Sequence, residues 1–155
     1  MFIKVLRFVR LPLLMILIYA IGRFMLGLRG VPYTPRGNAI FSVVGITMIS
    51  SIYFGALSGR VGGFNWLGAA LVGAVIGLFA QILIFSATFI SYAANLNTYF
   101  IHWDALNVPE GTVVPMADAL RARVGGLIFG PLFAAVMALI GRVLGVLAPQ
   151  PAKPS

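Results

Sequence analysis

The sequence predicts an all-α, polytopic integral membrane protein with four transmembrane helices, short loops and one longer extramembrane loop. Composition supports this fold class, because 61% of the 155 residues are hydrophobic and only 9% are charged, whereas a soluble domain carries about 25% charged residues. The mean hydropathy of +1.03 points the same way. In addition, four apolar segments are each long enough to cross a bilayer core of about 30 Å. We therefore expect lipid, rather than water, to surround most of the chain.

The first predicted helix covers residues 11–28, and Pro12 lies in its first turn, where a missing N–H costs little. The following segment, residues 29–37, is rich in Pro, Gly and Arg, so we predict an irregular turn there. Within this turn, Arg36 is expected to contact lipid headgroups. The second predicted helix then covers residues 38–57.

The third predicted helix covers residues 67–94, which is long for a single crossing at about 1.5 Å per residue. We expect it either to tilt or to project its hydroxyl-rich end, residues 86–94, into the membrane interface. The one substantial loop follows at residues 95–121. Pro109 and Gly111 predict that part of this loop is irregular.

The fourth predicted helix covers residues 124–148. Its start is expected to reach back to Pro115, because Pro suits the first turn and Asp118 lies near the positive end of the helix dipole. Residues 149–155, PQPAKPS, predict a Pro-rich extended tail. The sequence thus predicts a single transmembrane domain over residues 1–148.

Small residues recur every four positions on three of the predicted helices. In lipid, such rows let two helix backbones approach closely, and dispersion then stabilises their contact. The rows predict tight helix packing, with a partner helix either in this chain or in another. The positions are Ser51, Gly55 and Gly59 in the second helix; Ala69, Gly73 and Gly77, followed by Gln81, in the third; and Gly126, Gly130, Ala134 and Ala138 in the fourth.

Ionisable residues are almost absent from the predicted spans, which contain no Asp, Glu, His or Lys. This argues against a proton relay or an ion-coupled carrier, because such proteins place these groups at membrane depth. Two arginines, Arg23 and Arg142, do lie inside spans, about one to two turns from a helix end. We expect their side chains to reach the headgroups. The alternative is that one of them contacts a carboxylate, a lipid phosphate or a quinone-like headgroup.

The stretch TYFIHWD, residues 98–104, contains the only histidine of the chain. Tyr99 and Trp103 are typical of the membrane–water interface, and we expect His102 to be a hydrogen-bonded interfacial residue beside them. A catalytic interpretation would make His102 a general base oriented by Asp104. Residues two apart point in different directions on a helix, so the sequence predicts no catalytic site. Ligation of a haem or pigment by His102 is a further alternative.

Charge and cysteine content limit the remaining functions. The net charge of +8 comes from eleven Lys and Arg scattered between apolar segments, without the continuous basic patch of a nucleic-acid-binding protein. The absence of cysteine excludes disulfides, iron–sulfur clusters and Cys-based zinc sites. The sequence therefore predicts neither a nucleic-acid partner nor a metal site or cofactor.

Orientation follows from the number of spans and from basic residues. Four spans place both termini on one side, and Lys4, Arg7 and Arg10 precede the first helix. Such a cluster usually lies in the cytoplasm, so we predict cytoplasmic termini and an outward-facing loop at residues 95–121. The expected location is the cell membrane, as for a multi-pass protein of a bacterial inner membrane.

These observations favour a small structural or accessory subunit of a larger membrane complex, packed through Gly- and Ala-rich helix faces against lipids and other transmembrane subunits. The alternative is a homo-oligomeric transporter or channel for a neutral or lipophilic solute. A third hypothesis is an interfacial enzyme that acts on lipid through His102, Asp104 and nearby arginines.

Overall fold

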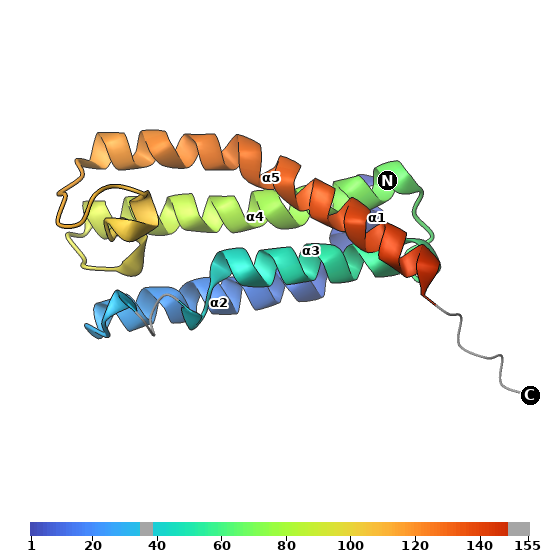
Figure 1. The fold of residues 1–155 in the computed structure, drawn as a ribbon, viewed down its shortest axis with the longest axis horizontal. Coiled ribbons are helices and arrows are strands. Elements are labelled where there is room, and N and C mark those ends of the chain that lie inside the picture. Colours follow the sequence, from blue (N-terminus) through green and yellow to red (C-terminus); the bar gives the residue numbers. More distant parts are fainter. Residues whose placement is uncertain (35–38, 149–155) are drawn as a thin grey trace, which may run out of the picture.

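The computed structural model describes residues 1–34 and 39–148, and in this part of the chain it contains helices and turns but no strand. The helices follow one another along the chain and lie side by side in a bundle (Figure 1). They are α1 (Phe2–Phe8), α2 (Arg10–Leu28), α3 (Val43–Arg60), α4 (Trp66–Ala93), the short 3-10 helices η2 (Tyr99–Ile101) and η3 (Asp104–Leu106), and α5 (Met116–Leu147).

Four of these helices, α2, α3, α4 and α5, are long and apolar enough to cross a membrane. They contain 19, 18, 28 and 32 residues, which correspond to lengths from about 27 Å to about 48 Å at 1.5 Å per residue. The predicted fold class is therefore confirmed. The bounds of α2 and α4 lie within one residue of the predicted helices. Helix α5 includes the early start expected near Pro115, whereas α3 differs from its prediction at both ends.

The start of α3 lies later than predicted because the chain forms a capped turn first. Ser42 is the N-cap, and its hydroxyl accepts a hydrogen bond from the Gly45 N–H at 3.1 Å. Phe41, just before the cap, has a φ of 54°. Its ring lies directly against Gly22 of α2 and edge-on to Tyr19. This aromatic contact holds the turn against α2, so α3 begins only at Val43.

The end of α3 also lies later than predicted, at Arg60. The Ser58 hydroxyl donates to the carbonyl of Gly55 at 2.6 Å and is fully buried. Because this hydroxyl bonds within its own helix, Ser58 continues the helix instead of opening a turn.

Helix α5 begins at Met116, with Pro115 as its N-cap, as the sequence predicts. It contains Pro131 near its middle, and the ribbon of α5 bends about halfway along (Figure 1). Proline in a helix interior removes a hydrogen bond and clashes with the preceding turn, which accounts for the bend. The second half of α5 consequently crosses over both α4 and α3.

The centre of the bundle is α4, which is in contact with α1, α2, α3 and α5. One face of α4 supplies the middle of the hydrophobic core with Val72, Ile76, Ala80 and Ile84, none of them more than 8% exposed. At one end of α4, the short helix α1 buries Val5 completely.

The two ends of the bundle are formed by different segments of the chain. One end carries α1, the α3–α4 turn and the end of α5; the other carries the α2–α3 connection and the loop that contains η2 and η3 (Figure 1). We call the second end the loop end. Helix α3 begins well short of the loop end, whereas α2, α4 and α5 continue toward it.

Candidate functional site

The small residues of α3, α4 and α5 meet around Ala138, which is fully buried. A β-carbon added to Gly55 of α3 would lie 2.6 Å from the Ala138 Cα, and one added to Gly73 of α4 would lie 2.7 Å from the Ala138 Cβ. Real β-carbons do not approach other atoms this closely. Glycine is therefore required on both helices at this junction, which lies within one chain.

Farther along the α4–α5 contact, Gly77 and Gln81 continue the row. A β-carbon on Gly77 would lie 2.6 Å from the Ala134 Cβ. The Gln81 side chain lies over two glycines of α5, since a β-carbon on Gly126 would meet its Oε1 at 2.6 Å and one on Gly130 its Nε2 at 2.8 Å. The Gln81 side chain thus occupies the space that Gly126 and Gly130 leave open.

Two glycines beyond the predicted row extend the contact between α3 and α5. Gly141 lies against the backbone of Ile52, and Gly145 lies against the backbone of Ala56. They stand four residues apart, so the spacing that identifies the other small residues would also have identified them. Of the other predicted positions, Ala69 of α4 and Ser51 of α3 are fully buried.

Arg142 lies at the end of the bundle opposite the loop end. Its guanidinium covers Gly59 of α3 and lies 5.6 Å from the centre of the Trp66 ring. The Arg142 Nε is buried, without a hydrogen-bond partner in the described part of the chain. Cation–π contact with tryptophan suits an arginine that is partly removed from water.

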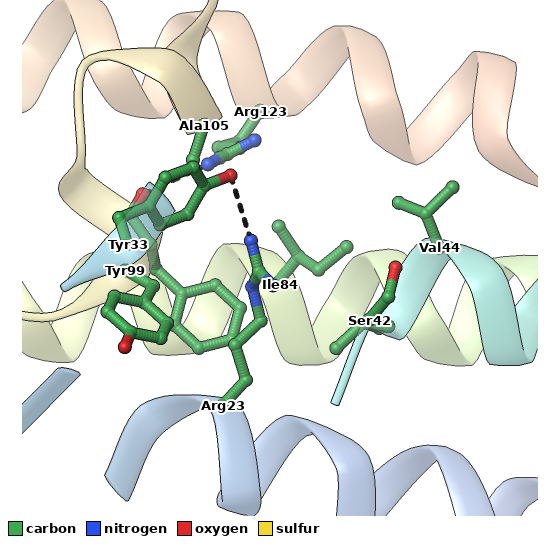
Figure 2. A pocket seen from close by; sticks show the side chains of 10 residues that line it. Arg23, Tyr33, Ser42, Val44, Ile84, Tyr99, Ala105 and Arg123 are labelled. Carbon is green, nitrogen blue, oxygen red and sulfur yellow. Dashed lines mark hydrogen bonds between the residues drawn. The ribbon is translucent and has the colours of Figure 1, made fainter. Parts of the chain in front are cut away.

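The main polar site lies at the loop end, where a pocket of about 220 Å³ opens above the start of α3. Figure 2 shows the side chains that line it, which come from α2, α3, α4, α5 and the connecting loops. We call it the arginine pocket, because Arg23 of α2 and Arg123 of α5 both line it. Its other lining residues are Tyr33, Ser42, Val43, Val44, Ile84, Tyr99, Phe100 and Ala105.

Tyrosines of the two loops surround the Arg23 side chain. Its Nη2 donates to the Tyr33 hydroxyl at 3.0 Å (Figure 2), and its guanidinium lies 5.3 Å and 5.7 Å from the ring centres of Tyr33 and Tyr99. The Tyr99 hydroxyl donates to the carbonyl of Val31 at 2.7 Å. Burial raises the pKa of Tyr99, and the nearby Arg23 guanidinium only partly offsets this. The Tyr99 hydroxyl therefore stays protonated and remains a hydrogen-bond donor.

Arg123 connects three elements at the other side of the pocket. Its Nε donates to the Thr88 hydroxyl of α4 at 3.3 Å, and its Nη2 donates to the Phe100 carbonyl of η2 at 2.9 Å. The sequence predicts Arg123 near the start of the fourth helix but indicates no role for it. No local pattern could have shown its role, because both acceptors come from segments distant along the chain.

The hydroxyl-rich end of α4 is buried against the loop. The Thr88 and Ser91 side chains are fully buried and donate to carbonyls one turn earlier in α4. The Ser91 hydroxyl also lies 2.7 Å from the Thr98 hydroxyl, which in turn accepts from the Phe100 N–H at 3.3 Å. We expected these hydroxyls to favour a helix end in the interface; in the structure they bind the loop to α4.

His102 lies beside the arginine pocket and stacks on the Tyr33 ring at 4.2 Å. Its Nδ1 accepts from the backbone N–H of Asp104 at 3.3 Å, so the contact between these two residues involves the Asp104 backbone and not its carboxylate. Trp103 packs next to His102 with ring centres 5.0 Å apart. The aromatic groups around His102 hold it in place.

Acidic side chains are absent from the described lining of the arginine pocket. The chain has three acidic side chains, all in the described residues, and none of them lines the arginine pocket. The ion pair between Asp118 and Arg121, at 3.7 Å, lies on the exposed surface of α5. Within the residues that the structure describes, no cluster of His, Asp or Glu could hold a metal ion. Arg36 and residues 149–155 lie outside the described residues.

The four long apolar helices define the class of the chain, a multi-pass α-helical membrane protein. Comparison of the chain with family models, with curated proteins and with solved structures gave no match. Function must therefore be inferred from the geometry of this chain alone.

Proposed function

We propose that the protein is a small accessory subunit of a larger membrane assembly and that it binds its neighbour through the outer face of α5. The observation that carries this proposal is the asymmetry of that helix. Its small residues face α3 and α4, as described above, whereas large apolar side chains cover the opposite face. These are Ile128, Phe129, Leu132, Val136 and Ile140, all between 44% and 71% exposed. Phe133, 48% exposed, lies at the edge of this face, where it also lines a small pocket with residues of α3 and α4.

Two aromatic rings distinguish this face. Phe129 is 71% exposed and Phe133 is 48% exposed, and residues four apart lie on the same side of a helix. Lipid is as apolar as these side chains, so helix association in a membrane depends on close packing rather than on hydrophobic exclusion. Aromatic residues are enriched where proteins bind one another, and a row of rings on an outer helix suits packing against a neighbouring subunit.

A photo-crosslinking experiment tests the proposal. A photoreactive amino acid would replace Phe129 in α5, and a matched control would carry it at Leu14, an apolar residue of α2 that is 54% exposed. Both variants would be irradiated in native membranes. We expect Phe129 to give a product with one other membrane protein and Leu14 to give products with lipid.

The captured protein would then be coexpressed with this chain. A fixed-stoichiometry complex in mild detergent, weakened by the double substitution Phe129→Ala/Phe133→Ala but not by Leu14→Ala, would support the proposal. Products with lipid alone from both positions would refute it. A product between two copies of this chain would instead favour a homo-oligomeric transporter.

A further inference from the structure

We infer that the arginine pocket binds the phosphate of an anionic phospholipid, with the first carbons of one acyl chain in a small apolar pocket between α3, α4 and α5. This inference does not depend on the accessory-subunit proposal. It begins with charge. Two guanidinium groups line one small pocket, and none of the three acidic side chains of the chain lines it.

The protein partners of both arginines support an anion in this position. The acceptors described above are a tyrosine hydroxyl for Arg23, and a threonine hydroxyl and a backbone carbonyl for Arg123. These three acceptors are uncharged groups that orient the guanidinium planes. A guanidinium has five N–H donors, so it can retain such bonds and still bind a phosphate oxygen. Charge in apolar surroundings is costly unless an opposite charge offsets it.

The start of α3 adds to this positive environment. Ser42, Val43 and Val44 line the pocket at the first turn of an 18-residue helix. The N–H groups of a first helical turn have no partners within the helix, and the helix dipole is positive there. Together with the arginines, this arrangement favours a phosphate or another small anion.

The size and surroundings of the pocket favour a lipid as the source of that phosphate. A volume of about 220 Å³ is below the range of about 300–1,000 Å³ typical of pockets that enclose a whole drug-sized ligand. It therefore suits a headgroup whose remaining part lies outside. An adjoining pocket of about 50 Å³ shares Val44 and Ile84 with it and continues between α3, α4 and α5 past Met48 and Phe133. A pocket with two guanidinium groups beside a small apolar pocket matches the headgroup and first acyl carbons of an amphiphile.

Native mass spectrometry of the delipidated, detergent-solubilised protein tests this inference. The protein would be mixed with phosphatidylglycerol, with phosphatidylcholine of the same acyl chains, or with inorganic phosphate. We expect one tightly bound phosphatidylglycerol and weaker binding of phosphatidylcholine. In the variant Arg23→Gln/Arg123→Gln, the affinity for phosphatidylglycerol should fall by about tenfold or more, as for the loss of charge-assisted hydrogen bonds.

Arg121→Gln is the matched control, because Arg121 lies on the same helix two residues from Arg123 and its side chain is 83% exposed. It should leave phosphatidylglycerol binding unchanged within about twofold, which corresponds to about 0.4 kcal/mol. Equal binding by the wild type and the double variant would overturn the inference. If inorganic phosphate displaced phosphatidylglycerol at millimolar concentration, free phosphate rather than a lipid would be the ligand of the pocket, and the inference would be overturned.

A second measurement needs no arginine variant and so remains decisive if the double variant does not fold. A phosphatidylglycerol with a photoreactive acyl chain would be added to the wild-type protein, and its attachment sites would be mapped. Labels near Val44, Met48 and Phe133 would support the inference. Labels spread evenly over the outer faces of the helices, with no preference for these three residues, would overturn it.

Discussion

At the junction of α3, α4 and α5, atoms of α5 lie where the β-carbon of a larger residue on α3 or α4 would be. Gly55 of α3 and Gly73 of α4 have no β-carbon, and Ala138 of α5 occupies the space beside both of them. Protein interiors are close-packed, so even one extra carbon must displace a neighbour. At the residue scale, the arrangement of the three helices therefore depends on the absence of a side chain at Gly55 and at Gly73.

We predict that Gly73→Ala destabilises the protein by about 1–3 kcal/mol, the usual range for overpacking a tight contact. The reason is the backbone carbon of Ala134, which would lie 2.7 Å from the new β-carbon. The measurement is reversible unfolding in mixed detergent. Gly125→Ala is the control, because nothing lies within 4 Å of a β-carbon at Gly125. It should be neutral or up to about 1 kcal/mol more stable. Equal effects of the two substitutions would show that α5 does not pack as described.

A second residue-scale prediction concerns Tyr99, whose pKa is raised above its ordinary value of 10.0 by burial. The folded protein holds this proton more tightly than the unfolded chain does. Its contribution to stability is therefore complete below about pH 10 and is lost as the pH rises above that value. We expect Tyr99→Phe to make the free energy of unfolding fall less steeply above about pH 10.

The same substitution removes the hydrogen bond to the Val31 carbonyl, so it should destabilise the protein by about 0.5–1.5 kcal/mol at neutral pH. Chemical unfolding across a pH series measures both effects. Parallel pH profiles for the wild type and the variant would contradict the burial of the Tyr99 hydroxyl.

At the element scale, hydrogen bonds join the loop end to the bundle. The buried Ser91 and Thr98 hydroxyls fasten the start of η2 to α4, and Arg123 fastens α5 to the same two elements. In apolar surroundings, a buried polar group that loses its partner is costly. These bonds therefore determine the position of the loop that closes the arginine pocket.

A double-mutant cycle should detect this connection. We predict that Ser91→Ala and Thr98→Val are each destabilising by about 1–3 kcal/mol and that their coupling energy exceeds about 0.5 kcal/mol. The free energies of unfolding of the wild type, both single variants and the double variant supply the measurement. Additive effects within about 0.3 kcal/mol would show that the two hydroxyls do not interact.

The element scale also shows what the sequence could predict. Hydropathy located all four long helices, because a span of apolar residues has few alternatives in lipid. It did not predict α1, whose seven residues include Lys4 and Arg7. It could not place the start of α3 either, because that start depends on the packing of Phe41 against Gly22, a contact between residues that no local pattern connects.

At the scale of the whole molecule, the sequence predicted which residues are small but not what they would contact. Rows of glycine fit a partner in the same chain as well as one in another chain. In the structure, Gly55, Gly73 and Gly77 are in contact with α5. The arginine pocket was less predictable, because four helices and two loops contribute to it. Of its lining residues, the sequence singled out only Arg23, as a charge inside an apolar span, and Tyr99, as an interfacial aromatic residue.

The central claim is that α2, α3, α4 and α5 each cross a membrane, with the loop end on one side and α1 on the other. Because the chain contains no cysteine, single cysteines can report this directly. Val113 near the loop end is 91% exposed, and Val61 in the α3–α4 turn is 70% exposed. Both would be replaced by cysteine in separate variants.

The decisive measurement is labelling of these two variants in sealed, right-side-out vesicles with a maleimide that cannot cross the membrane. We predict that Val113→Cys reacts in intact vesicles and that Val61→Cys reacts only after detergent is added, as expected for cytoplasmic termini. The reverse pattern would invert the orientation and keep the four crossings. Reaction of both cysteines in intact vesicles, or of neither, would contradict the arrangement of four membrane-spanning helices.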